Sequence, residues 1–565
     1  MTVGEAGRTA GRAAGDRLGS IASASIGSRA LSAREVAACA GLLAVLGAAA
    51  FGSHVLNGGF YNDDWAYLVA YRYSDGGVLG ALGAFSWLSF RPVGVVYWPL
   101  LYAILGTQPS GYLAWTVALA VLLSSCLYAL LRTLGMERLH AGIIAALVLL
   151  FPAADSTRLW LNASISSLGI VFYLLGTLIA VRGLATSRRR GWVFHAGAVC
   201  LYLLAIWTYE ATAGPILLSL LLYRLRTAWR PALARWLVDV AVIGASVVVL
   251  GSRSWHEPQA LSAQVGHAAR IAREALSILT SAALPLGKPG TVATAALLAG
   301  LAAAGVVVWR LLDERDPARG ELRRWLAIAV AGGVALGAGY LAYVPADADV
   351  YSPLRPGQHN RVNNLASIGY VTLVYSLVIV AGTLLFRGLS GRVAWGAAFA
   401  LLAGCMIAFG YVQRLERHAA HWDRSARMQE QVLASVRGAV PRPPRGAVLY
   451  TFGHPTEAAP GVPVFSAAWD LDGAVKVTWD DPSLAAYPAI PGTTFLCGES
   501  SFAARNANND YLGPQAAQSS PYGSAFVIDV ASSRAIRIRD RSACRSAAQS
   551  FDQGALARSG VAFAS

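Results

Sequence analysis

The sequence predicts an all-α polytopic membrane protein with about eleven transmembrane helices, followed by a small C-terminal domain outside the membrane. Of its 565 residues, 55% are hydrophobic and only 14% are charged, whereas a soluble domain carries about 25% charged residues. Apolar runs close to the roughly 20 residues that cross a bilayer recur as far as residue 412. Beyond that point the composition becomes polar, which indicates a soluble C-terminal region.

Residues 1–35 form a polar tail that carries several arginines. The tail lacks the short basic segment, apolar segment and small-residue cleavage site of a signal peptide. We expect a disordered cytoplasmic arm.

The transmembrane domain is predicted to occupy residues 36–412, with each span assigned from its apolar length and flanking charges. Residues 92–106 are short and carry Pro92 and Pro99, so they form either a separate span or a helix beside the membrane. The predicted spans are 36–54, 92–106 continuing into 111–133, 140–153, 164–183, 192–210, 212–226, 236–252, 291–312, 324–344, 366–386 and 393–412.

The arginines decide between these two options. If 92–106 does not cross, the arginine-rich connections near 132–138, 182–190, 224–235, 310–324 and 387–392 all fall on the side of the basic N-terminal tail. Positive charge marks the cytoplasmic side. The N-terminus is therefore predicted to be cytoplasmic and the C-terminal domain external. The same rule accounts for most of the net charge of +15, so we expect no nucleic acid partner.

Residues 413–445 are predicted to form a polar stalk helix and a proline-rich linker. Residues 446–565 follow as an external β-rich or α/β domain, with Cys497 and Cys544 as a plausible disulfide pair outside the cytoplasm. Strands are predicted at 446–452, 474–479, 524–530 and 535–539, the last two forming a hairpin.

The most informative segment follows the first apolar run. Asp63 and Asp64 stand there among Tyr61, Trp65 and Tyr67, after two glycines. Aromatic rings favour the membrane interface, and carboxylates near hydrocarbon are usually retained for chemistry or ion handling. The simpler alternative is a solvated helix N-cap.

The other connections on this side also concentrate polar groups. A carboxylate can take a proton from a hydroxyl, and Arg or Lys can stabilise a leaving phosphate. Together they suit glycosyl transfer from a lipid phosphate. The polar residues concerned are Asp155, Arg158, Tyr209, Glu210, Lys288, Arg361 and Asn363.

Four motifs in order resemble the GT-C superfamily of polyprenyl-phosphate-sugar-dependent glycosyltransferases, in the branch of the protein O-mannosyltransferases. They are the acid pair Asp63-Asp64, Arg91-Pro92 before a hydrophobic helix, the segment 209–215 (YEATAGP) and the segment 361–369 (RVNNLASIG). The last departs from the family pattern, because Ala366 replaces a frequent proline and two asparagines replace aromatics. The likeness covers residues 36–412.

The resemblance implies an inverting hexosyl- or pentosyltransferase in which one acid of the pair, with Asp63 preferred to Asp64, is the base. Arg91, Arg361 and Lys288 are candidates for the donor phosphate, although Arg361 could instead be an interfacial anchor and Lys288 a turn residue. Glu210, Tyr209, Asp155, Arg158 and Asn363 are candidates for the cavity or the acceptor site.

The implied partners are a polyprenyl-phosphate-linked sugar, membrane lipid, and a glycan, lipid or protein acceptor. No clear metal-ligand set occurs, and a need for Mg²⁺ or Mn²⁺ stays open. Two other functions are considered, a polysaccharide polymerase or ligase and a non-enzymatic transporter of lipid-linked glycans. Composition suggests a bacterial inner membrane, and the resemblance implies a role in the synthesis of cell-envelope glycans.

Overall fold

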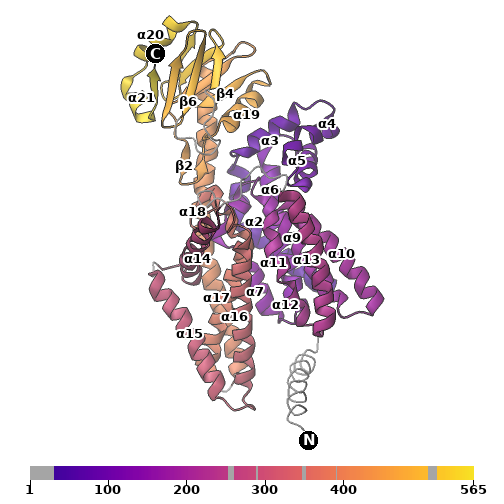
Figure 1. Ribbon diagram of the computed structural model, residues 1–565. Helices are drawn as coiled ribbons and strands as arrows, with labels where there is room; N and C mark the ends of the chain where they lie inside the picture. The colour runs from indigo at the N-terminus through magenta and orange to yellow at the C-terminus, as the bar shows by residue number, and fades with distance from the viewer. Residues whose placement is uncertain are drawn as a thin grey trace.

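The computed structural model describes residues 31–251, 260–287, 290–346, 351–389, 391–506 and 518–564. It consists of a helical bundle and a strand-containing C-terminal domain that the long helix α18 carries beyond one end of the bundle (Figure 1). Within these residues, nine helices are long and apolar enough to cross a membrane. They are α2 (Ala33–Asn57), α6 (Pro109–Thr133), α9 (Ser164–Gly183), α10 (Arg188–Thr208), α13 (Trp229–Gly251), α15 (Thr291–Leu311), α16 (Pro317–Leu341), α17 (Asn363–Phe386) and α18 (Arg392–Ala439).

The chain is therefore a helical multi-pass membrane protein, as predicted. Two predicted spans are shorter than expected. The first is the single helix α7 (Arg138–Leu149), which at 1.5 Å per residue is only about 18 Å long. The second is broken into α11 (Ala213–Leu217) and α12 (Ser219–Arg224). Neither reaches the length of about 20 residues that a full crossing needs.

The arginine-rich connections meet at one end of the bundle. Glu35 at the start of α2 accepts bonds from Arg132 (2.6 Å) and Arg138 (2.9 Å). Arg324 of α16 lies 3.3 Å from Glu137, and Arg392 of α18 lies 3.7 Å from Asp316. These contacts join connections that the charge pattern assigns to a single side of the membrane.

The connections at the other end contain several short helices and the longer helix α14. They are α3 (Asp63–Arg72), α4 (Gly77–Ala84), η1 (Ser86–Leu88), α5 (Pro92–Leu105), η2 (Pro152–Ala154), α8 (Ser156–Leu159), η3 (Glu210–Thr212), α14 (Leu261–Ala283) and η4 (Gly357–Val362). Tyr102 near the end of α5 donates to the carbonyl oxygen of Asp64 in α3, and Arg91 just before α5 bonds Glu210. Both ends of α5 therefore stay at this end of the bundle, as the charge pattern predicts. The amphipathic helix α14 was not predicted.

Small residues allow α16 and α17 to pack closely. A Cβ atom on Gly369 would lie 2.3 Å from the backbone nitrogen of Leu336. A Cβ atom on Gly339 would lie 2.7 Å from the Cα atom of Ala366, a fully buried residue. Small residues at helix interfaces in membranes allow backbones to approach in this way. Ala366 therefore fits a site where a larger side chain would separate the helices.

The expected stalk is not a separate helix. α18 runs without interruption through 48 residues from Arg392 to Ala439, and Pro441 follows its end. Its buried face continues from Ile407 to Val436. The membrane bundle and the C-terminal domain therefore share one rigid element.

Over its described residues, the C-terminal domain contains two four-stranded sheets, with strand orders β4-β1-β8-β9 and β10-β5-β6-β7, and the β2–β3 hairpin. β1 pairs in parallel with β4 and β8, and β8 pairs antiparallel with β9 as the predicted hairpin. The elements are β1 (Val448–Phe452), β2 (Glu457–Ala459), β3 (Val462–Pro463), α19 (Ala468–Trp479), β4 (Ala485–Pro488), β5 (Thr493–Cys497), β6 (Ser501–Asn506), β7 (Gln518–Pro521), β8 (Ala525–Asp529), β9 (Arg534–Ile538), α20 (Arg541–Ser550), α21 (Gln553–Ser559) and β10 (Ala562–Ala564).

One predicted strand is wrong. Residues 474–479 belong to the helix α19, which crosses from β1 toward the parallel strand β4, and parallel neighbours require such a crossover. Asp470 stabilises the start of this helix by accepting bonds from the backbone nitrogens of Ser466 and Ala467. The expected disulfide is present, and it joins Cys497 at the end of β5 to Cys544 in α20.

Candidate functional site

The acid pair opens α3 at the end of the bundle that faces the C-terminal domain (Figure 1). Asn62, the residue before the helix, has φ of 47°, a left-handed conformation that is uncommon for a residue other than glycine. Its side chain is held on both sides, since Nδ2 donates to Gln358 (2.8 Å) and Oδ1 accepts from Trp469 (2.9 Å). The turn that presents the acids is thus fixed by distant segments.

Asp64 is buried, and both of its carboxylate oxygens are hydrogen-bonded. Only 1% of the residue is exposed, and its two carboxylate oxygens accept bonds from the backbone nitrogens of Tyr61 (3.0 Å) and Asn162 (3.1 Å). Burial raises the pKa of Asp64 well above its ordinary value, although these two bonds act in the opposite direction. This geometry assigns Asp64 to holding α3 against the 160–162 segment.

Asp63 is only partly buried. Oδ2 accepts a 2.6 Å bond from the side chain of Asn162, and Oδ1 accepts a 2.9 Å bond from the indole of Trp469. Burial raises the pKa of Asp63, while the charge of Arg361 and these two bonds oppose the shift. A carboxylate oxygen has two acceptor positions, so each oxygen of Asp63 can still accept a second hydrogen bond.

Arg361 lies in η4, just before α17. Its guanidinium carbon is 5.7 Å from the centre of the Trp160 ring, and Nη1 donates to the carbonyl oxygen of Gln358 (3.1 Å). Trp160 in turn donates to the carbonyl oxygen of Tyr61, two residues before Asp63. Gln358 also accepts a 2.8 Å bond from the side chain of Asn62, so it links Arg361 to the residue beside Asp63. The charge of Arg361 opposes the raised pKa of Asp63 and contributes to the lowered pKa of Glu210.

Arg91 and Glu210 form a two-point ion pair. Nε and Nη2 of Arg91 donate to the two carboxylate oxygens at 2.9 and 2.5 Å, the fork geometry that suits arginine. Burial favours a raised pKa of Glu210, but the charge and hydrogen bonds of Arg91 prevail and lower it. The Arg91 guanidinium also lies 4.7 Å from the ring centre of Tyr209, whose hydroxyl accepts from Tyr343 (3.2 Å).

Two further tyrosines connect these groups. The charges of Asp63, Arg91 and Arg361 all act on Tyr67, whose pKa burial raises well above its ordinary value. Burial also raises the pKa of Tyr351, and the charges of Arg361, Arg91 and Glu210 modify that shift. These effects agree with the hydrogen bonds that link the Asp63 segment to Arg361 through Gln358, and Arg91 to Glu210. The four charged residues lie at the same end of the bundle, although 298 residues separate the first from the last in the sequence.

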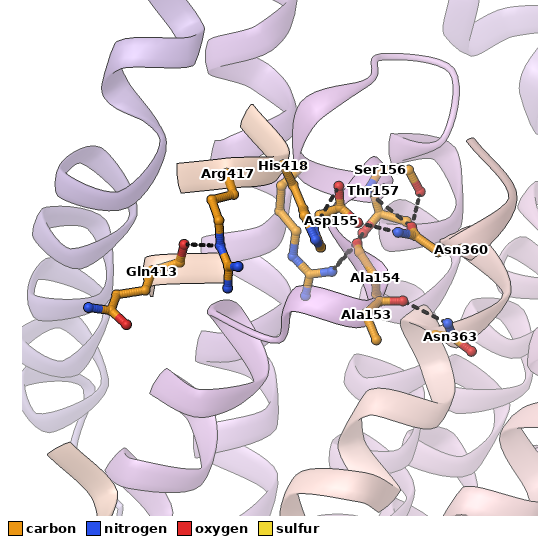
Figure 2. Close-up of polar contacts among 11 residues, drawn as sticks. Ala153, Ala154, Asp155, Ser156, Thr157, Asn360, Asn363, Gln413, Arg417 and His418 are labelled. Atoms are coloured by element: carbon orange, nitrogen blue, oxygen red, sulfur yellow. Dashed lines mark hydrogen bonds and ion pairs between the residues drawn. The ribbon is translucent and has the colours of Figure 1, made fainter. Parts of the chain in front are cut away.

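Asp155 and Asn363 belong to a polar cluster (Figure 2), and Arg158 contacts the same segment through Ala154; all three residues are buried. Asp155 accepts from Asn360 and lies 3.5 Å from His418 of α18. Arg158 donates to the carbonyl oxygens of Ala154 (2.7 Å) and Val148 (2.8 Å), and burial lowers its pKa to about 10. Asn363 donates to the carbonyl oxygens of Ala153 and Pro353. These three side chains support η2, α8 and η4 from within the protein.

Lys288 lies outside the described residues. Among the residues that the structure does describe, no group of three or more His, Cys, Asp or Glu side chains is arranged to hold a metal ion.

Two contacts of the site could not be anticipated from the motifs. Trp469 comes from the C-terminal domain, and Gln358 lies three residues before Arg361, yet both bond the Asn62–Asp63 turn directly. In the sequence, Trp469 is visible only as a tryptophan in a polar region, and this does not predict that it contacts Asp63.

Comparison with protein-family models gives no match for this chain, and comparison with curated proteins gives no relative.

Proposed function

We propose that the protein is an inverting membrane glycosyltransferase that moves a sugar from a polyprenyl phosphate to an acceptor hydroxyl. The observation that carries the proposal is the link between the segments of Asp63 and Arg361: Asn62, the neighbour of Asp63, donates to the side chain of Gln358, whose carbonyl oxygen accepts from Arg361. A base and a phosphate-binding cation are the two groups that this reaction needs. The GT-C-like order of motifs supports the same assignment.

In the proposed reaction the acceptor oxygen attacks the anomeric carbon of the donor. The bond from that carbon to the phosphate oxygen breaks, and the polyprenyl phosphate leaves with the electron pair. Asp63 takes the hydroxyl proton, and its raised pKa makes it a stronger base than an exposed aspartate. Because the burial and bonding of Asp64 leave one accessible acid, a single displacement with inversion is favoured.

Arg361 is the better candidate for the leaving phosphate. Glu210 already neutralises much of the charge of Arg91 through two hydrogen bonds, so Arg91 serves mainly to hold η3 and Tyr209 beside α5. This interpretation places Arg361 ahead of Arg91 as the residue that binds the donor phosphate.

An apolar groove supports a lipid-linked donor. It has a volume of about 380 Å³ and lies between α14, with Ile271 and Leu276, and α16, with Gly333 and Gly337. At its end Tyr340 and Val344 belong to the segment whose Tyr343 bonds Tyr209 beside Arg91. An isoprenoid tail in this groove would place its phosphate at the site. Burial of apolar chain contributes about 0.8 kcal/mol per CH₂ group.

The orientation follows from charge. We assign the arginine-rich end to the cytoplasm by the positive-inside rule, so Asp63 and the C-terminal domain face the external side of a bacterial inner membrane. The disulfide between Cys497 and Cys544 agrees with that assignment, because disulfides persist in oxidising compartments.

The test is transfer in proteoliposomes that contain polyprenyl-phosphate sugars and candidate acceptors. Wild-type protein should consume donor and release polyprenyl phosphate, and Asp63→Asn should reduce the rate about 100-fold or more. Membrane insertion and thermal stability of the variant serve as controls. Full activity of Asp63→Asn would reject the proposal. A polysaccharide polymerase or ligase that needs no acid would instead require Arg361 while tolerating the loss of both aspartates.

A further inference from the structure

The C-terminal domain contacts both parts of the candidate site. From α19, the indole Nε1 of Trp469 lies 2.9 Å from Oδ1 of Asp63 and 2.9 Å from Oδ1 of Asn62. From the β2–β3 turn, the carbonyl oxygen of Gly461 accepts a 2.8 Å bond from the backbone nitrogen of Gln358. One contact reaches the segment of the acid, and the other reaches the segment of Arg361.

The contact with α3 is close and has several points of attachment. A Cβ atom on Gly473 would lie 2.7 Å from the carbonyl oxygen of Trp65, so this position of α19 has no space for a side chain. Farther along, the hydroxyl of Tyr73 donates to the carbonyl oxygen of Lys476 at 2.9 Å. Helix α19 therefore contacts α3 at several points along its length.

The contact with η4 is equally close. Gly357 and Gly461 both have positive φ, and a Cβ atom on Gly357 would lie 2.1 Å from the carbonyl oxygen of Gly461. The next residue, Gln358, then completes a bridge. Its side chain accepts from Asn62, and its carbonyl oxygen accepts from Arg361.

We propose that the C-terminal domain is a structural part of the catalytic site, in which Trp469 is a positioning residue that fixes the carboxylate of Asp63 relative to Arg361. This inference rests on the proposed function for its catalytic consequence. The positional claim itself, that α19 and the β2–β3 turn hold α3 and η4 together, needs no substrate. Trp469 acts through Asp63 and is not assigned any contact with the reacting atoms.

The chain offers a matched pair of variants for the test. Trp469→Phe keeps a ring in place but removes the N–H group that bonds Asp63. Trp479→Phe makes the same change at the other end of α19, where the indole donates to the carbonyl oxygen of Pro441 at 3.4 Å. Gln358→Leu is a second variant that breaks the bridge to Asn62 without altering the C-terminal domain.

Hydrogen exchange of the full-length protein without donor tests the positional claim. Trp469→Phe and Gln358→Leu should speed exchange in residues 60–66 and 357–362, with β8 unchanged as evidence of a folded domain, and Trp479→Phe should leave these segments unchanged. Unaltered exchange in both variants would overturn the proposal, whether or not the wild type transfers sugar. If Trp469→Phe does not fold, Gln358→Leu decides the result alone.

A pH profile of transfer tests the catalytic consequence. Loss of a hydrogen bond to a charged group should lower kcat/KM about 10- to 100-fold in Trp469→Phe. The acid limb should also move to higher pH, because the lost bond no longer opposes the raised pKa of Asp63. A merely structural defect would lower the rate without moving that limb, and this result would contradict the positioning role. Inactive wild type with faster exchange in the variants would reject the proposed function and leave the positional claim supported.

Discussion

Asn162 and Asp63 are joined by a 2.6 Å hydrogen bond from the side-chain amide to Oδ2 of the carboxylate. The backbone nitrogen of the same asparagine bonds Asp64 at 3.1 Å. One residue at the end of the α8 segment therefore aligns both acids, but it leaves them in different environments. Asp64 is enclosed, whereas Asp63 remains partly exposed, and Gln358 links its neighbour Asn62 to Arg361.

Substitutions of Asp63 and Asp64 should therefore have different effects on thermal stability. In Asp64→Asn, the side-chain NH2 group would face one of the two backbone N–H groups, of Tyr61 or Asn162, that now donate to the carboxylate. That buried N–H group would lose its acceptor, which lowers the free energy of unfolding by about 1–3 kcal/mol. We expect a clear loss of thermal stability in detergent, measured by loss of the folded fraction on heating. Asp63→Asn should lose much less stability. Equal destabilisation by the two variants would contradict the separate roles.

Substitutions of Arg361 and Arg91 should change the dependence of the transfer rate on donor concentration to different extents. Arg361→Gln removes the cation assigned to the phosphate and should raise the donor KM about 10- to 100-fold. Arg91→Gln breaks a pair whose carboxylate is half exposed, so its effect should be smaller, and the added substitution Glu210→Gln should restore part of the loss. Initial rates measured across donor concentrations give the donor KM of each variant. A larger effect of Arg91→Gln would reverse the assignment.

Filling the groove between α14 and α16 should block the lipid tail. Added Cβ atoms at Gly333 or Gly337 meet no atom within 4 Å, so Gly333→Leu and Gly337→Leu can fold while occupying the groove. We expect weaker binding of polyprenyl phosphate, measured by displacement of a fluorescent analogue. Gly300→Leu in α15, which is equally open, is the matched control. Unchanged binding in both groove variants would argue for another tail site.

The docking of α19 should depend on pH through Asp470. Burial raises the pKa of this carboxyl from 3.8 to about 7 in the folded protein, while backbone bonds oppose the shift. The folded state therefore holds the proton more tightly than the unfolded chain, so the stabilisation is complete below about pH 4 and is lost as the pH rises through about 7. The difference reaches about 4 kcal/mol.

Hydrogen exchange of α19, corrected for intrinsic rates, measures this effect. The free energy of local opening should fall between pH 5 and pH 8 in the wild type, and Asp470→Asn should remove the dependence. A wild-type opening free energy that rises with pH would contradict the assignment.

Much of this architecture follows from local patterns in the sequence. Apolar length predicted the membrane helices, and the arginine distribution predicted that α5 returns to the end it started from. The close packing of α16 and α17 was harder to predict from the sequence, because Gly339 and Gly369 each lie against the backbone of the other helix. The strand predicted at 474–479 failed because its alternation was weak evidence, whereas the capping contacts of Asp470 fix a helix.

The candidate site was predicted only in part. Asp63, Arg91, Glu210 and Arg361 carry charges beside apolar helices, and such placement is visible in a single sequence. Trp469 and Gln358 carry no such signal, since their importance arises from a contact between segments more than 100 residues apart. Asp155, Arg158 and Asn363 look similar to site residues in the sequence, but burial assigns them to supporting the connections behind it.

The most direct test of the account is a structure of the protein with a non-hydrolysable polyprenyl-phosphonate sugar bound. The account predicts the phosphonate at Arg361, the sugar between this cation and Asp63, and the tail in the groove between α14 and α16. A headgroup bound at the arginine-rich end of the bundle, or one bound away from Asp63, would contradict it.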